Sequence, residues 1–294
     1  MGSTERESTC YNSNYLAEYY DIWTGTRNDT AYNADSLLRM IPSAKGSSSP
    51  LLVLDVGTGT GRLIQAMARH AAANPGVSLA HVEFIGLDIE PHMLARASAV
   101  NTTLASETGC AGITWLLGSA LEMSSLPIFQ PQPPSMLRRT VDLLTIGFGS
   151  ISHFYLPGQP EQFLREVARL LTPGTGQAQI SVVNKLLVDP EQGLDKDITD
   201  PLPPSEHASV EFPGVVYRET VTENGVQGNV WRVVRHIEVW QGSETLLERN
   251  IDTAMFRVWT ETELRGMISA AGLQLVQVVP QEVDTLFVVS VRDA

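Results

Sequence analysis

A glycine-rich run at residues 55–61, DVGTGTG, has the composition of a ligand-binding turn. It lies between an apolar stretch at residues 51–56, typical of a buried strand, and a stretch with helical periodicity at 60–73. Glycine backbone permits close approach to a ligand, and the amino end of a following helix favours a negative group. We expect the ligand to contact Asp55, Gly57, Thr58, Gly59 and Gly61.

The glycine spacing argues against a dinucleotide ligand. A G-x-G-x-x-G fingerprint that starts at Gly57 needs glycine at 62, where Arg62 stands, and one that starts at Gly59 needs glycine at 64, where Ile64 stands. A nicotinamide-dependent oxidoreductase is therefore disfavoured.

A second chemical group follows the next apolar stretch, residues 82–87. Asp88 ends this predicted strand, and a carboxylate there can accept both hydroxyls of a ribose. The alternative is a helix-capping role ahead of Pro91, and the two roles are compatible. We expect Ile89 and Met93 to contact the same ligand.

The third group follows the predicted strand at 141–146. The loop starts at Gly147 and Phe148, which we expect to contact the same ligand as Asp88, and ends in Ser150, Ser152 and His153. A histidine can accept a proton from an amine, hydroxyl or thiol near neutral pH. His153 is thus a candidate base and the two serines are candidate acceptor contacts, unless His153 only begins or caps the next helix.

An aromatic helix is predicted at residues 15–23. It carries Tyr15, Tyr19, Tyr20 and Trp23, which could form a wall over a cationic ligand. Packing of an amphipathic helix is the alternative for most of them. Tyr20 is the best single candidate for a hydroxyl at the reacting centre.

Strand and helix patterns alternate from residue 51 to residue 183, which predicts a parallel sheet with helices on both faces. One helix is expected over 91–108, and Thr260 with Glu263 forms a capping box for a late helix. Residues 1–13 are expected to be disordered. Segments 215–221 and 230–240 should form a hairpin that turns at Glu223-Asn224-Gly225, followed by a second hairpin turn near 241–243.

Composition limits the possible partners. The 20 Lys and Arg against 33 Asp and Glu give a net charge of −13, which disfavours nucleic acid and anionic membranes. No apolar stretch reaches the roughly 18–20 residues of a membrane span, and no secretory signal is seen. A cytoplasmic monomer or homodimer is expected, without a metal site, because the histidines and the two cysteines lack metal-ligand spacing.

Two of these segments resemble motifs of the class I S-adenosylmethionine-dependent methyltransferases. LLVLDVGTGTGRL looks like the first motif of that family and FIGLDIEPHML like its second. The resemblance implies an α/β three-layer sandwich with a mostly parallel seven-stranded, Rossmann-like sheet, and S-adenosyl-L-methionine as cofactor. It also implies an adenine contact from Ser119, Ala120 and Leu121, with Ser119 where the family commonly has aspartate.

The layout of the chain is similar to that of family members that methylate small molecules. It implies lid helices within 1–50, a cofactor-binding core at 51–184, an inserted antiparallel β cover at 185–259, and a closing helix and strand pair at 260–294. The expected reaction is methyl transfer to a small metabolite or natural product, at an amine nitrogen or else at oxygen, sulfur or carbon. A cyclase or binding protein that holds the cofactor without methyl transfer is the alternative.

Overall fold

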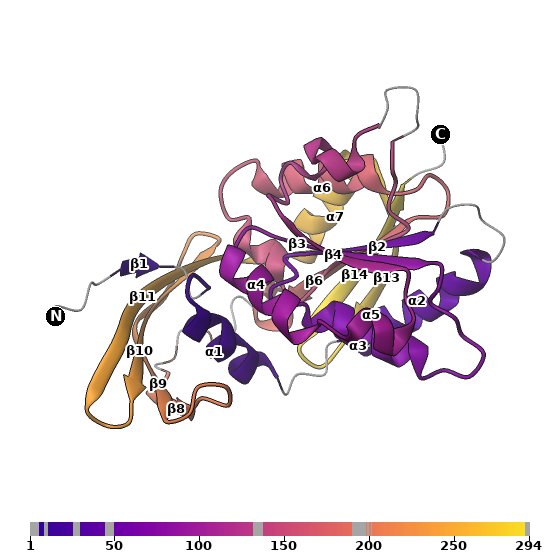
Figure 1. The fold of residues 1–294 in the computed structure, drawn as a ribbon. Helices are drawn as coiled ribbons and strands as arrows, with labels where there is room; N and C mark the ends of the chain where they lie inside the picture. Colours follow the sequence, from indigo (N-terminus) through magenta and orange to yellow (C-terminus); the bar gives the residue numbers. More distant parts are fainter. Residues whose placement is uncertain are drawn as a thin grey trace.

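The main body is a seven-stranded sheet in the order β13-β14-β6-β5-β2-β3-β4 (Figure 1). The computed structural model describes residues 6–8, 11–25, 30–44, 50–131, 138–189, 198, 200 and 202–291. The five parallel strands are β2 (Leu51–Val56), β3 (Val82–Asp88), β4 (Gly112–Leu117), β5 (Leu143–Ile146) and β6 (Gln177–Val183). The closing strands β13 (Leu273–Pro280) and β14 (Asp284–Val291) are antiparallel. The predicted mostly parallel sheet is therefore confirmed.

Helices cover both faces of this sheet, because strands buried on both faces must pack against apolar helix faces. One face packs on α2 (Ala31–Ala44), α3 (Arg62–Ala72) and α5 (Leu104–Thr108). The other face packs on α6 (Gln159–Leu170) and α7 (Glu261–Ala270). The predicted capping box begins α7: the Glu263 amide donates to Thr260 Oγ1 at 3.1 Å.

The single helix expected over 91–108 is wrong, because the segment forms two helices. α4 (Pro91–Val100) is followed by Asn101, whose backbone dihedral angles are not helical, and α5 begins three residues after Asn101. The Asn101 side-chain amide donates to Ala97 O at 2.9 Å and to Thr60 O at 3.3 Å. These two hydrogen bonds hold Asn101 against the glycine-rich turn, and α4 ends there.

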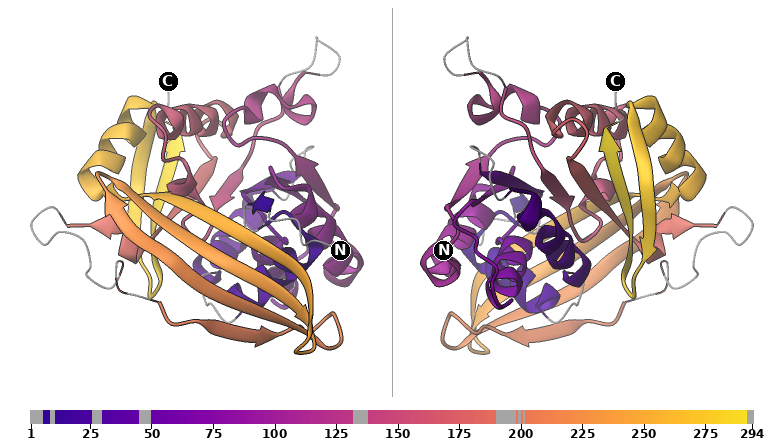
Figure 2. Two further views of the ribbon diagram at one scale, coloured as in Figure 1. Left: turned by 90° about the vertical axis from the view of Figure 1, so that its left-hand side faces the viewer. Right: turned by 90° about the vertical axis from the view of Figure 1, so that its right-hand side faces the viewer.

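A separate sheet of five strands lies beside the main body, in the order β1-β11-β10-β9-β8 (Figure 2). Four are antiparallel neighbours: β8 (Ser205–Ala208), β9 (Val215–Gln227), β10 (Val230–Gln241) and β11 (Thr245–Arg257). The short strands β7 (Leu187–Val188) and β12 (Trp259–Thr260) pair with each other where this sheet joins the core. We call the five-stranded sheet the cover.

The turn expected at Glu223-Asn224-Gly225 is wrong. These residues continue β9, and the chain reverses at Gly228 and Asn229, where Gly228 has φ +61°. Asn224 is held in the strand by its side chain, which accepts from Trp231 Nε1 at 2.7 Å. The second predicted hairpin turn is confirmed, with Gly242 at φ +62° between β10 and β11.

The N-terminal segment contributes to both parts of the molecule. β1 (Arg6–Ser8) adds a parallel edge strand to β11, so the expectation of disorder over 1–13 is wrong for these residues; residues 1–5 and 9–10 lie outside those described. The aromatic helix α1 (Asn14–Thr24) then lies between the cover and the core (Figure 1). No helix in the described part is long and apolar enough to span a membrane.

Candidate active site

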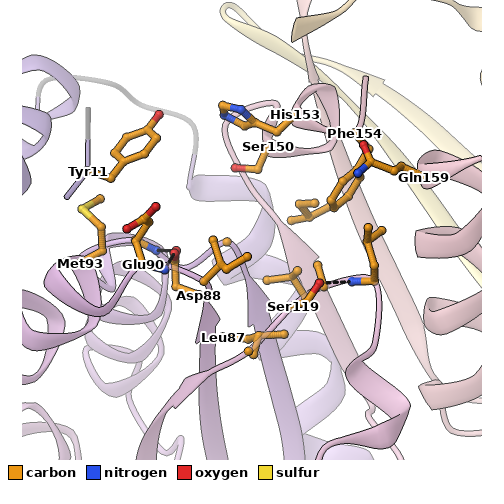
Figure 3. A pocket seen from close by; sticks show the side chains of 18 of the residues that line it. Tyr11, Leu87, Asp88, Glu90, Met93, Ser119, Ser150, His153, Phe154 and Gln159 are labelled. Carbon is orange, nitrogen blue, oxygen red and sulfur yellow. Dashed lines mark hydrogen bonds between the residues drawn. The ribbon is translucent and has the colours of Figure 1, made fainter. Parts of the chain in front are cut away.

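A cavity of about 340 Å³ opens at the carboxyl ends of β2, β3 and β5, beneath the N-terminal segment. Open α/β sheets bind their ligands at this edge because the loops there diverge from the sheet. Figure 3 shows Asp88, Glu90 and Met93 on the same side of the cavity as Tyr11, and Phe154 and Gln159 on another. Eleven predicted site residues line it. They are Tyr20, Gly57, Gly59, Asp88, Ile89, Met93, Ser119, Ala120, Leu121, Ser150 and His153.

The glycine-rich turn forms the floor of the cavity. Gly57 and Gly59 have φ values of +65° and +56°, which side chains disfavour. A Cβ on Gly57 would lie 3.4 Å from the Ser150 side chain, and one on Gly59 would lie 3.2 Å from the Met93 methyl carbon. Glycine at both positions therefore leaves room for a ligand between the turn, Ser150 and Met93.

Asp88 closes the floor and ties β3 to the turn. Its Oδ2 accepts the Gly59 amide at 2.7 Å, and its Oδ1 accepts the Glu90 amide at 2.9 Å. Burial raises the pKa of the Asp88 carboxyl, while hydrogen bonds from the backbone of Glu90, Gly59 and Ile89 favour its charged form. A carboxylate offers about four lone-pair sites, so Asp88 can still accept a ribose hydroxyl.

Three of the predicted glycine-turn contacts, Asp55, Thr58 and Gly61, are absent from the cavity lining. Asp55 is 2% exposed and accepts the hydroxyls of Thr58 and Thr145 at 2.7 Å each. A Cβ on Gly61 would lie 2.5 Å from the Trp115 ring, so this glycine makes room for that side chain. These residues support the turn on the side that faces the core and not the cavity.

Burial of Asp55 gives a testable pH dependence. Desolvation raises its pKa to about 6, against hydrogen bonds from Thr145 and Thr58 that lower it. Between pH 4 and 6 the folded protein holds a proton that the unfolded chain has released, so this group's contribution to stability falls as pH rises. We expect Asp55→Asn to gain roughly 3 kcal/mol relative to the wild type between pH 4 and 7. Urea unfolding of both proteins across this range measures it, and parallel stability curves would refute it.

The third group of predicted residues forms a short 3₁₀ helix, Ser150–His153, after β5. With three residues per turn, residues i and i+3 share a face. Ser150 and His153 accordingly both face the cavity (Figure 3). Ser152 is fully buried on another side, where it accepts from Trp259 Nε1 at 3.0 Å.

His153 lies between aromatic rings at the end of the cavity nearest the cover. Its ring is 4.8 Å from the ring of Phe256 and 6.5 Å from that of Tyr11. The imidazole has an edge exposed to the cavity, but desolvation by the surrounding protein lowers its pKa to about 4; the charge of Asp252 opposes this shift and that of Arg235 adds to it. At neutral pH the ring is therefore uncharged, with one nitrogen available as a hydrogen-bond acceptor.

Five further predicted residues lie outside the cavity lining. In the lid, Tyr15 packs on Phe212, Tyr19 donates to Glu219 Oε2 at 2.9 Å, and Trp23 packs on Phe148. Gly147 and Phe148 form the backbone of the β5 loop. Tyr15, Tyr19 and Trp23 thus pack against the cover and the β5 loop and do not line this cavity.

Several lining residues were not predicted from the sequence: Tyr11, Val56, Leu87, Glu90, Gly118, Ile146, Phe154 and Gln159. Most of them are sequence neighbours of predicted residues at strand ends, so adjacency was the available signal. Tyr11 had no such signal, because it belongs to a polar tail without periodicity. Its ring contacts that of Tyr20 edge-on, with centroids 5.7 Å apart.

The lid is fixed over this cavity by polar contacts on both sides. Asp21 accepts from Thr60 Oγ1 of the glycine turn and from Arg96 Nε of α4, at 2.5 Å each. Glu18 accepts from the Val210 and Glu211 amides at 2.8 and 2.7 Å. Tyr20 lies between these anchors and is thereby held against Gly59.

The residues present fit an adenosine-type ligand with a flexible amino-acid tail. A carboxylate with free lone pairs, a glycine floor and an apolar wall around Leu121 and Phe154 are in one cavity. Among the described residues no group of three or more His, Cys, Asp or Glu side chains is placed to hold a metal ion.

Comparison with known proteins found related sequences. Residues 47–231 match a family model described as a methyltransferase domain. The chain is 31% identical over 287 residues to N-methyltransferase FrzE from a Cladobotryum species, with 94% of each protein covered.

Solved structures show the same fold at low sequence identity. A sugar N-methyltransferase from Streptoalloteichus has a TM-score of 0.65 at 18% identity, covering 100% of this chain and 98% of its own. An S-adenosylmethionine-dependent methyltransferase from Clostridium acetobutylicum has a TM-score of 0.62 at 14% identity, covering 95% and 98%.

Proposed function

The chain belongs to the S-adenosylmethionine-dependent methyltransferases, and on that basis we propose that it methylates an amine nitrogen of a small metabolite or natural product. The observation that supports this proposal is the position of His153, which lines the cavity at the end away from Ser119 (Figure 3). The N-methyltransferase relative favours nitrogen among the possible acceptor atoms.

We assign the cofactor to the floor and the adenine end of the cavity. Asp88 would hold the ribose hydroxyls, Gly57 and Gly59 would receive the amino-acid tail, and Ser119 with Leu121 would contact the adenine. When bound, the cofactor supplies an electrophilic methyl group on a sulfonium. Tyr20 and Met93, which meet above Gly59, would enclose that end of the ligand.

The acceptor would lie between this end and His153. Because His153 is neutral, it can accept a hydrogen bond from an amine N–H and so direct the nitrogen lone pair toward the methyl group. The aromatic rings of Tyr11 and Tyr20 form one wall of this space and exclude water. The chain's contribution is therefore orientation of the amine, desolvation and a hydrogen-bond acceptor at a ring nitrogen of His153.

The test is incubation with methyl-labelled S-adenosylmethionine and a panel of primary and secondary amines, phenols and thiols. We expect mass spectrometry to find one added methyl group on an amine. Label only on oxygen, sulfur or carbon would overturn the nitrogen assignment. Absence of transfer to every acceptor, with cofactor binding shown by calorimetry, would favour the role without methyl transfer.

Ser119 allows a separate prediction at the adenine end. Its Oγ accepts the Leu121 amide at 3.2 Å, so it offers the adenine amino group only a neutral partner. We expect Ser119→Asp to tighten S-adenosylhomocysteine binding about tenfold through one charge-assisted hydrogen bond. Calorimetry with S-inosylhomocysteine, which lacks the amino group, should show no gain. An equal gain for both ligands would contradict the assignment.

A further inference from the structure

The loop that carries Ser150 and His153 has a backbone conformation that needs outside support. Phe148 is the only non-glycine described residue with positive φ, at +51°, and Gly149 follows at +66°. A bulky side chain disfavours this region, so the conformation persists only where surrounding contacts fix it. A Cβ on Gly149 would lie 2.6 Å from Val183 of β6, so the loop is pressed against that strand.

The contact that fixes this turn is a buried polar chain from two strands of the core. The Gly149 amide donates to Ser181 Oγ at 3.0 Å, and Ser181 Oγ donates to Asp284 Oδ2. Ser181 is 0% exposed and Asp284 is 1% exposed. The second oxygen of Asp284 accepts from Gln281 Nε2 at 3.0 Å, which orients the carboxylate.

A buried carboxylate is costly unless hydrogen bonds compensate it, and this one directs its oxygen at the serine beneath the loop. Ser181 can accept the Gly149 amide only while its own proton points away, and Asp284 enforces that orientation. The hydrogen bonds between Asp284 and Ser181 and between Ser181 and Gly149 therefore set the position of the turn from which the 3₁₀ helix starts.

We propose that Ser181 and Asp284 are positioning residues that hold Ser150 and His153 at the cavity. The role of His153 in this proposal rests on the proposed function. The placement of the loop rests only on the hydrogen bonds described above. The hydrogen bond from Trp259 to Ser152 holds the carboxyl end of the same 3₁₀ helix, and Ser181 holds its amino end through Gly149.

The first test measures the loop without an acceptor, using the full chain with S-adenosylhomocysteine. In Ser181→Ala we expect the Gly149 amide to exchange with deuterium about fivefold faster, as loss of one hydrogen bond implies. The His153 ring, followed by NMR, should titrate at higher pH than in the wild type as it becomes more solvated.

A matched control is available at the opposite end of the same sheet. Thr172 Oγ1 donates to Asp142 Oδ1 at 2.8 Å, and Asp142 Oδ2 accepts the Leu52 amide at 2.8 Å. Thr172→Ala removes the same kind of bond away from the cavity. It should leave Gly149 exchange and the His153 titration unchanged; equal effects in the two variants, or none in Ser181→Ala, would overturn the proposal.

The second test uses the amine that gives the highest turnover in the panel. Ser181→Ala should lower kcat roughly tenfold to a hundredfold through misplacement of the loop, with S-adenosylhomocysteine affinity within about twofold. Asp284→Asn, which keeps an acceptor oxygen, should retain more turnover than Asp284→Ala at equal folded fraction. Equal losses in these two variants would overturn the role of the carboxylate. If the wild type methylates no amine, the proposed function fails while the exchange and titration results still decide the positioning role.

Discussion

Asp88→Ala is expected to lower the affinity for S-adenosylmethionine by on the order of a hundredfold or more. In the proposed function the carboxylate accepts from the ribose, and each hydrogen bond to a charged group contributes about 1.5–3 kcal/mol. The substitution also removes the acceptor that ties the Gly59 amide to β3, so the glycine turn loses support under the ligand. Titration calorimetry measures the affinity.

A control on the same strand separates charge from position. Glu83 lies in β3 toward its amino end and pairs with Arg139 away from the cavity. Glu83→Ala should leave cofactor affinity unchanged, and Asp88→Asn, which keeps one carbonyl oxygen, should bind with intermediate affinity. If Asp88→Ala binds the cofactor as tightly as the wild type, Asp88 has no role in holding it.

His153→Ala is expected to lower methyl-transfer turnover by about a hundredfold, through loss of the hydrogen bond that orients the acceptor amine. Cofactor affinity should stay nearly the same, because His153 lies at the end of the cavity proposed for the acceptor. His153→Gln keeps a hydrogen-bond acceptor and should retain part of the activity. Single-turnover rates with saturating cofactor measure the effect.

The lowered pKa of His153 also predicts how turnover depends on pH. Because desolvation by the surrounding protein lowers the pKa of His153 to about 4, the ring stays neutral well below pH 6.5. The acid limb of the turnover profile should therefore follow protonation of the acceptor amine and shift when the amine is changed. His70→Ala, an exposed histidine of α3 beside Asp35, should leave turnover unchanged. Two results would contradict the assigned role. One is a fall of turnover near pH 6.5 that is the same for every amine, and the other is full turnover in His153→Ala.

Local signals predicted the core of this protein well. The apolar run at 51–56 is buried at every position, and the glycines after it adopt the positive φ values that the motif implies. Asp88 ends its strand as predicted and lies within hydrogen-bond distance of the glycine turn. These features follow from short-range spacing, which the sequence records directly.

The hairpin shows where a local signal competes with tertiary contacts. Asn224 and Gly225 have the composition of a tight turn, yet Asn224 bonds to Trp231 across the strand pair and β9 continues to Gln227. Pairing and side-chain contacts over the whole strand outweigh the preference of one dipeptide.

Sequence by itself determined the fold class and the strand ends that line the cavity, because periodicity and glycine spacing act over a few residues, and its resemblance to a known family implied the cofactor. Only the tertiary structure decided which aromatic residues reach the cavity. It places Tyr11 and Tyr20 there and packs Tyr15, Tyr19 and Trp23 into the lid. It also revealed the hydrogen bonds that connect Asp284 through Ser181 to Gly149, three residues that lie far apart in the sequence. Such contacts depend on how distant strands meet in the sheet, and that information is absent from local spacing.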